Sequence, residues 1–394
     1  MKGKITMKLF GQRRGMFTMM ASILVFSLLL AACGSSNTGS SGTTPTTGSS
    51  SVGPNGKGCM KVGVLLPETA TSARWDNNDR PALQADIPAQ LPGATVLYNN
   101  AQGSADTQQT QAQADLTSGA CILVLAPVDS VKAAAIVSAA KAKGVPVISY
   151  DRLIWSNDTN YYVSFDGVAV GKLQGQYVAD HYQSYVTKNG TKNTVMISGS
   201  QTDNNALLFS KGAHQALDPL FASGALKKVY EKFTPGWDNA TAQTEMQAAL
   251  TANGNKVAVA YVANDGMANN VIAALKAVQL NGKVLVTGQD ATVAGLQNIL
   301  KGDQAMTVYK AVPKEAMATA QLVAALSKGT DTTSLINGTT VTVPISGGAN
   351  IPSVLETPVA VDISNIKSTV IADNYVTAAQ ICAGLPSGTG GICP

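Results

Sequence analysis

The sequence predicts an α/β protein made of two doubly wound parallel-sheet domains. Short apolar segments alternate with helical patterns at about 30 residues per pair, which is typical of βαβ units. This alternation occurs in two successive sets, and 394 residues is the usual length of two domains. Polar residues follow the strands in both sets, and parallel sheets bind ligands beyond the carboxyl ends of their strands. We therefore expect a ligand site in a cleft between the two domains.

The first set contains five predicted strands, each a short apolar run next to a turn signal. Its second helix is rich in Gln and follows a start signal at 103–106, and its third is capped by Asp129 or Ser130. The strands are expected at 61–66, 95–98, 121–125, 145–150 and 161–166, and the helices at 79–90, 106–118, 130–143 and 168–185.

The second set repeats this order. Its strands are expected at 193–198, 227–233, 257–262, 284–288 and 305–310, and its helices at 206–222, 239–251, 268–278 and 313–327. The remaining chain is rich in Thr, Pro and Gly, with one extended segment at 359–363 and a short helix before Cys382.

The N-terminus has the pattern of a secretory signal: basic residues up to Arg14, then an apolar run from Met16 to Leu30. The run ends in Ala31-Ala32-Cys33, which resembles the lipobox of bacterial lipoproteins and makes Cys33 the predicted lipidation site in a leader covering 1–33. A transmembrane anchor is the alternative, but the run is short and ends in small residues. Residues 34–57 are rich in Ser, Thr and Gly, which predicts a flexible tether. We expect a folded body outside the cytoplasm, anchored by lipid to the plasma membrane.

Four cysteines remain after the leader, an even number in an oxidising compartment. Cys59 precedes the first strand and Cys121 begins the third, so a bridge between neighbouring strands is expected. Cys382 and Cys393 can close the C-terminal tail. Metal binding is the alternative, but the sequence has no Cys-x-x-Cys motif and only two histidines. We expect neither metal nor cofactor.

The formal charge of +4 comes from the leader, where five of the 28 basic residues lie within the first 14 positions. The remaining 23 basic residues face 24 acidic ones. A nearly neutral mature chain has no basic footprint for nucleic acid.

The candidate ligand site combines carboxylates, amides and cations with two tryptophans. Carboxylates and amides bond hydroxyl groups, cations donate strong hydrogen bonds, and Trp rings offer flat apolar faces to a sugar ring. This mixture suits a neutral, polyhydroxylated ligand better than an anion, which favours basic side chains or glycine-rich turns at helix N-termini. The candidates are Arg74, Trp75, Asp151, Arg152, Asp203, Asn205, Trp237, Asn264, Asp290 and Lys310.

Each candidate also has an ordinary structural interpretation. The segments 203–205 and 264–266 are typical of turns, and Asp151 and Asp290 can cap turns or helices. Either tryptophan can be a core residue, and Arg152 and Lys310 can be solvated surface cations. The site hypothesis therefore depends on all ten residues lying at strand exits, not on any one of them.

No enzyme fingerprint follows a predicted strand: Gly-x-Ser-x-Gly, Walker A and Gly-x-Gly-x-x-Gly are all missing there. Two carboxylates such as Asp151 and Asp290 are the minimum for glycoside hydrolysis, which is the catalytic alternative. A tethered protein with a cleft for a sugar fits capture and delivery better, so we expect a binding protein and not an enzyme.

These residues resemble the type I periplasmic sugar-binding proteins of ABC importers, and among them the D-xylose-binding members. The resemblance covers about residues 60–382 and is carried by the segments 73–75, 149–154, 162–166, 203–206, 288–291 and 306–310. It implies that nine of the ten candidates bind the ligand, with Asp203 nearby and with Trp75 and Trp237 on the two faces of a pyranose ring.

The resemblance also implies a three-crossing hinge between the lobes, near Phe165, near Val308 and after Ile345. The implied first lobe is 58–165 plus 309–345, and the second is 166–308 plus 346–394. The implied function is capture of a monosaccharide, most specifically D-xylose, by hinge closure of a monomer that then docks on a membrane permease. A glucose- or arabinose-type receptor and a sugar-sensing lipoprotein feeding a kinase or chemoreceptor are the alternatives. A repressor of the same fold is disfavoured by the signal peptide and the missing helix-turn-helix.

Overall fold

The computed structural model describes residues 54–394, so the predicted leader, Cys33 and most of the predicted tether lie outside the described residues. The last residues of that tether, from 54 on, lie within the described part of the chain. Pro54–Gly56 forms a 3-10 turn, and Gly56 is buried against Ile122 and Pro146, where an added Cβ would lie 3.0 and 3.1 Å from their side chains. None of the described helices combines the length and the apolar character needed to cross a bilayer.

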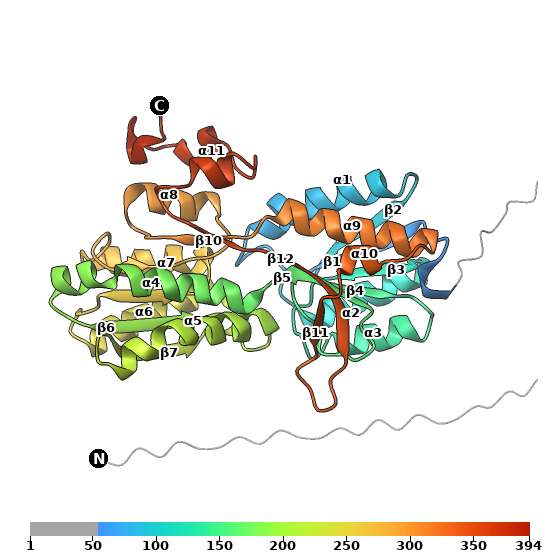
Figure 1. Cartoon of the computed structure of the whole chain (residues 1–394), viewed down its shortest axis with the longest axis horizontal. Helices are drawn as coiled ribbons and strands as arrows, with labels where there is room; N and C mark the ends of the chain where they lie inside the picture. The colour runs from blue at the N-terminus through green and yellow to red at the C-terminus, as the bar shows by residue number, and fades with distance from the viewer. Residues whose placement is uncertain (1–53) are drawn as a thin grey trace, which may run out of the picture. The chain divides into compact units, whose positions relative to one another are not determined.

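The first lobe is built on a seven-stranded sheet in the order β11-β12-β5-β4-β3-β1-β2 (Figure 1). All neighbouring pairs are parallel except β11 and β12. The central strands are buried apolar runs, as expected for a parallel sheet covered on both faces. The bounds are β1 (Lys61–Leu66), β2 (Thr95–Asn100), β3 (Ile122–Leu125), β4 (Val147–Tyr150), β5 (Tyr161–Phe165), β11 (Thr340–Thr342) and β12 (Asn350–Glu356).

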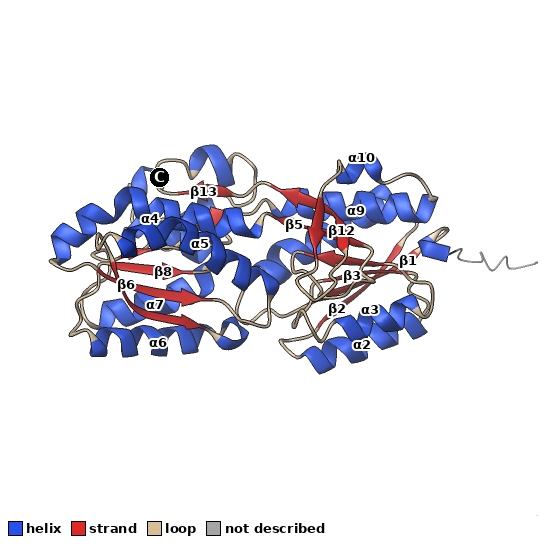
Figure 2. Cartoon of the chain, turned by 60° about the horizontal axis from the view of Figure 1, so that its bottom comes forward, coloured by secondary structure: helices blue, strands red, loops and turns tan. Residues whose placement is uncertain are grey.

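Helices cover both faces of this sheet (Figure 2). On one face α1 (Arg80–Gln90) packs beside α9 (Val312–Lys328), with α10 (Thr333–Ile336) next to α9. On the other face lie α2 (Ala105–Thr117) and α3 (Ala134–Lys141). Each face has its own apolar core, because alternate strand residues point to opposite sides.

The second lobe contains a four-stranded parallel sheet in the order β7-β6-β8-β9. The paired helices α4 and α5 pack on one face and α6 and α7 on the other (Figure 2). The bounds are β6 (Asn193–Ser198), β7 (Lys227–Phe233), β8 (Val259–Val262), β9 (Leu285–Val286), α4 (Gly167–Asn189), α5 (Asn204–Ala222), α6 (Asn239–Ala252) and α7 (Asp265–Ala277).

Close packing of α4 against α5 fixes the start of α5, which faces the cleft. An added Cβ on Gly171 would lie 1.8 Å from the carbonyl oxygen of Phe209, and one on Gly212 would lie 2.0 Å from that of Val168. Only glycine allows two helix backbones to approach this closely.

The chain crosses between the lobes three times: from β5 into α4, from β10 (Thr307–Tyr309) into α9, and from β12 into β13 (Val359–Val361). β10 pairs antiparallel with β13 and is bridged to the second sheet through Gln289 and Val308. The boundary expected at 346 is too early. β12 pairs in parallel with β5, so the chain stays in the first lobe to Glu356.

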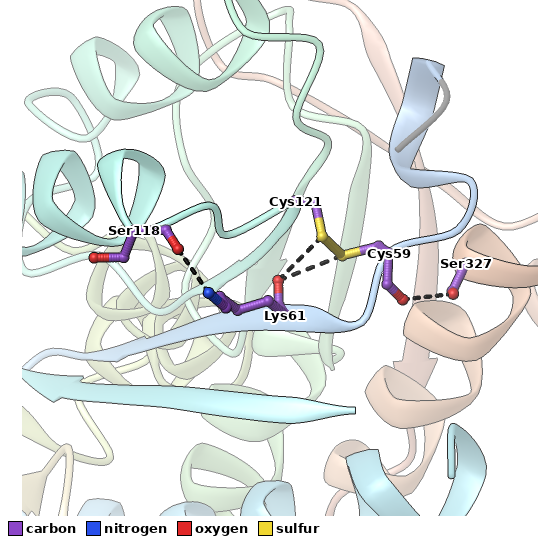
Figure 3. Close-up of a disulfide and its surroundings, with 5 residues drawn as sticks. All are labelled: Cys59, Lys61, Ser118, Cys121 and Ser327. Atoms are coloured by element: carbon purple, nitrogen blue, oxygen red, sulfur yellow. Dashed lines mark hydrogen bonds between the residues drawn. A yellow bond between two sulfur atoms is a disulfide. The ribbon is translucent and has the colours of Figure 1, made fainter. Parts of the chain in front are cut away.

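The C-terminal segment packs on the second lobe through α8 (Val293–Lys301), which the sequence analysis did not predict, and α11 (Ala378–Cys382). Both expected disulfides are present. Cys59–Cys121 joins the start of β1 to the start of β3 (Figure 3), and Cys382–Cys393 closes the tail. Figure 3 also shows the Cys59 carbonyl accepting a 2.6 Å bond from Ser327 of α9, which ties this end of the sheet to its covering helix.

Candidate functional site

All ten predicted site residues line one cavity between the two lobes. Its empty volume, which includes space open to solvent, is about 320 Å³. The residues come from the carboxyl ends of strands in both lobes, as the parallel topology requires. Four residues that the sequence analysis missed also line this cavity: Thr71, Ser72, Phe209 and Gln289.

Arg74 is held in place by buried carboxylates of the first lobe. Its Nε and Nη2 donate to both oxygens of Asp79 at 2.9 and 2.5 Å, and Nη2 also donates to Glu315 at 3.1 Å. Its Nη1 donates to Asp151 Oδ2 at 2.9 Å. The Tyr150 hydroxyl in turn donates to Asp79 at 2.8 Å. The guanidinium is thus fixed from behind, with Nη1 directed to the cavity residue Asp151.

Trp75 lies in the wall of the first lobe and is 2% exposed. The guanidinium carbons of Arg74 and Arg152 lie 4.6 and 5.2 Å from its ring centroid, within cation–π range. A sugar ring stacked on Trp75 would have to share or displace these contacts.

Asp151 connects the first lobe, the hinge and the second lobe. Its Oδ2 accepts from Lys310 Nζ at 2.8 Å, and Lys310 directly follows the hinge strand β10. Its Oδ1 accepts from Asn205 Nδ2 of the second lobe at 3.1 Å. Burial alone would raise the pKa of Asp151, but the positive charges of Arg74 and Lys310 outweigh burial and lower it below its usual range. Asp151 is therefore a permanent acceptor at neutral pH.

Asp203 joins three site residues. Its Oδ2 forms an ion pair with Arg152 across the lobes, 2.9 Å from Nε, and accepts from Trp237 Nε1 at 3.0 Å. Its Oδ1 accepts from the backbone N–H of Asn205 at 2.9 Å and so caps α5, where the sequence analysis offered a turn as the structural alternative. One residue therefore acts both as a helix cap and as a cavity residue.

The ring of Trp237 packs closely against Gly199, where an added Cβ would be 2.2 Å from the ring. Phe209 contacts this ring edge-on, with 6.3 Å between centroids. Glycine and an aromatic edge thus fix the orientation of the ring, while Asp203 fixes its N–H end.

Asp290 and Asn264 supply polar groups from the second lobe. Asp290 Oδ2 accepts from Ser72 Oγ at 3.2 Å. Asp290 Oδ1 has no hydrogen-bond partner within the described residues, although Arg74 Nη1 and Lys310 Nζ lie 3.7 and 3.9 Å away. Asn264 caps α7 through the N–H of Met267. An unpaired buried oxygen is costly, so Asp290 is suited to accept a bond from a ligand hydroxyl.

Three of the ten site residues have positive φ angles although none is glycine: Asp151 (56°), Trp237 (58°) and Asp290 (100°). Such conformations are uncommon for non-glycine residues and persist only where surrounding contacts impose them. Their concentration around one cavity indicates that side-chain placement there outweighs local backbone preference.

The charges around the cavity are strongly coupled. Burial raises the pKa of Glu315 well above its usual range, and the nearby charge of Asp151 raises it further. Burial would lower the pKa of Arg74, but the carboxylates of Asp151 and Asp79 raise it well above the usual value. The site therefore keeps its guanidinium charged and favours a protonated Glu315. Within residues 54–394, no group of three His, Cys, Asp or Glu side chains is placed to hold a metal ion.

The residues that sequence reasoning missed had little signal of their own. Phe209 is five positions into α5 and looks like an ordinary core residue of that helix. Ser72 and Gln289 adjoin predicted site segments, so including whole exit loops would have found them. Asp79 and Glu315, the buried partners of Arg74, lie in helical segments with no local pattern to mark them.

Comparison with known proteins agrees with this architecture. Residues 62–331 match the family model described as a periplasmic binding protein domain. The D-xylose-binding periplasmic proteins of Haemophilus influenzae and Escherichia coli are each 37% identical to the chain, over 82% of its length and 92% of theirs.

Among solved structures, an ABC transporter solute binding protein from Clostridium phytofermentans with bound β-D-glucose has a TM-score of 0.72 and 30% identity. The match covers 82% of this chain and 99% of that one. The chain belongs to the periplasmic binding protein family and has its type I fold.

Proposed function

We propose that the protein captures a monosaccharide, D-xylose in preference to other sugars, in the cavity between its lobes. The observation that carries this proposal is the lining of the cavity by carboxylates, amides, cations and two tryptophans from both lobes. Hydroxyl groups both donate and accept, so a neutral sugar can satisfy a lining of mixed sign. D-xylose is preferred because the two relatives at 37% identity are named for that sugar.

The competing sugar is D-glucose, which is bound in the related structure from Clostridium phytofermentans. The two sugars differ by one hydroxymethyl group.

We infer that binding is coupled to closure of the lobes. The lobes touch through side-chain contacts that a hinge motion would break, including Arg152–Asp203 at 2.9 Å and Asn205–Asp151 at 3.1 Å. Both pairs line the cavity, so a sugar bound there would contact both lobes at once. A ligand that contacts both lobes shifts the population toward the closed form.

The same proposal includes delivery of the sugar to an ABC importer from outside the cytoplasm, with Cys33 as the lipid anchor. Support comes from the family, from the relatives named as periplasmic proteins and from the two disulfides, which form in oxidising compartments.

A binding role suits this site better than hydrolysis of a glycoside. A glycosidase needs a general acid whose pKa is raised. Asp151 would not serve as that acid, because Arg74 and Lys310 stabilise its ionised form against the cost of burial and lower its pKa.

A thermal-shift screen with D-xylose, D-glucose, L-arabinose and D-ribose tests the proposal. A ligand at a hundred times its Kd stabilises the folded state by about 2.7 kcal/mol, which raises Tm by several degrees. We expect the largest rise with D-xylose. A larger rise with D-glucose would transfer the assignment to that sugar, and no rise with any monosaccharide would refute the proposal.

A further inference from the structure

Asp265 is a buried carboxyl group directly behind the cavity wall. It is the first residue of α7 and follows Asn264, but it is 0% exposed and does not line the cavity. Its Oδ2 accepts from the backbone N–H and the hydroxyl of Thr292 at 2.8 and 3.2 Å. Its Oδ1 accepts from Gln304 Nε2 at 2.8 Å and from Thr307 Oγ1 at 2.9 Å.

These bonds join the start of α7 to Thr292, at the end of the loop that carries Asp290, and to the segment 304–307. The backbone N–H of Asp265 donates to the carbonyl of Gln289 at 2.9 Å. Thr307 Oγ1, which donates to Asp265, also accepts from the N–H of Ala291 at 3.1 Å. Asp265 therefore contacts the loop directly at both of its ends and indirectly at its centre.

The loop needs such support because its own backbone is in an unfavourable conformation. Asp290 and Ala291 have consecutive positive φ angles of 100° and 49°. Non-glycine residues adopt such angles only where surrounding contacts impose them. β10 supplies part of this restraint, since the N–H of Asp290 donates to the carbonyl of Val308 at 2.9 Å.

The carboxyl group has no room to move. An added Cβ on Gly288 would lie 2.1 Å from Asp265 Oδ1, and one on Gly295 would lie 2.2 Å from Oδ2. Both glycines therefore leave just enough space for this side chain, and any displacement of it would carry the bonded loop along.

We propose that Asp265 is a positioning residue: its carboxyl group holds the loop 288–292 and the start of α7, and thereby sets where Asp290 and Asn264 meet the ligand. The effect on sugar binding rests on the proposed function, whereas the effect on the position of the loop does not. Polar groups at a binding site need placement within about 0.5 Å, so a small shift of this loop is costly.

Two variants test it by different routes. Asp265→Asn replaces one carboxyl oxygen by an N–H₂ group. That group would face another donor, either the N–H of Thr292 or the Nε2 of Gln304, and a hydrogen bond would be lost. Gly295→Ala keeps every hydrogen-bonding group and displaces the carboxyl by its added methyl. Leu250→Ala is the control, because Leu250 is a core residue of the same lobe on α6, which supplies no cavity residue.

The first readout is hydrogen exchange without sugar, measured on peptides that cover 264–267 and 288–292. We expect faster exchange there in Asp265→Asn and Gly295→Ala than in Leu250→Ala. Unchanged exchange in both variants overturns the inference, whether or not any sugar binds. This readout therefore separates a failure of the inference from a failure of the proposed function.

The second readout is sugar affinity by calorimetry, with Tm measured on the same samples. We expect Asp265→Asn and Gly295→Ala to bind at least about tenfold more weakly than wild type, and Leu250→Ala to lose Tm but keep its affinity. In an Asp290→Asn background the loss from Asp265→Asn should be smaller, because both changes act on one contact. Wild-type affinity in both variants, or an equal loss in Leu250→Ala at an equal fall in Tm, overturns the positioning role.

Discussion

Trp155 offers a test of lobe closure that leaves the cavity untouched. Its Nε1 donates to Asn204 Oδ1 across the lobes at 3.1 Å, and neither residue lines the cavity. Ser130 reinforces the junction: its N–H donates to the carbonyl of Thr202 at 2.8 Å, and its hydroxyl accepts from the N–H of Asn204 at 3.1 Å. If closure is part of binding, weakening this junction must weaken binding.

Trp155→Phe removes the one bond from the indole and keeps an aromatic ring. A net hydrogen bond is worth about 1 kcal/mol, and a buried group left unpaired costs up to about 3 kcal/mol. Asn204 is 4% exposed, and its Nδ2 already has no partner within the described residues, so its whole side-chain amide would become unpaired. We expect affinity to fall at least about fivefold and at most about 150-fold.

Calorimetry on wild type, Trp155→Phe and Tyr161→Phe measures this effect. Tyr161→Phe is the matched control, since it removes a 3.2 Å hydroxyl contact with Thr332 inside the first lobe. The control should lose stability without losing affinity. Equal affinity of wild type and Trp155→Phe, or an equal loss in both variants, would refute the coupling of this junction to binding.

Three further predictions concern the site, the disulfide and pH. Trp237→Ala and Asp290→Ala should each lose most of the affinity for D-xylose in calorimetry, because one removes a ring face and the other a buried acceptor. Replacing Cys59 and Cys121 by Ser opens a loop with a sequence separation of 62 and should lower the free energy of unfolding by about 4 kcal/mol in denaturant titrations. Burial raises the pKa of Asp265 to about 7 in the folded protein, although its hydrogen bonds act to lower it. As pH rises, this carboxyl group therefore loses its proton in the unfolded chain before it does so in the folded protein. The free energy of unfolding should therefore fall as pH rises from about 4 to about 7, and Asp265→Asn should remove that part of the fall.

Each of these predictions has a clear contrary result. Unchanged binding in both site variants would remove the site assignment. A double Ser variant as stable as wild type would show that the bridge does not restrain the unfolded chain. A pH dependence that is the same with and without the Asp265 carboxyl would mean that this group does not titrate between about pH 4 and pH 7.

The sequence predicted the cleft well because strand exits are local features. A run such as Val147–Tyr150 followed at once by Asp151 and Arg152 places those side chains beyond a strand, whatever the rest of the fold does. The same argument applied to both halves brought ten residues to one cavity.

The errors involve contacts between segments far apart in the chain. β12 contains Pro352 and a mixed pattern, so it does not look like a strand. It becomes one by pairing with β5, almost 200 residues earlier, and that pairing moves the lobe boundary from 346 to Glu356. Glu315, one buried partner of Arg74, was missed for the same reason, since it lies 241 residues away along the chain.

The central claim is that a sugar binds between Trp237 and the polar groups of both lobes. A calorimetric titration of the protein with D-xylose, run beside Trp237→Ala, measures this most directly. We predict saturable heat with one site per chain in the wild type and little or none in the variant. No saturable heat from the wild type, or the same isotherm from both proteins, would contradict it.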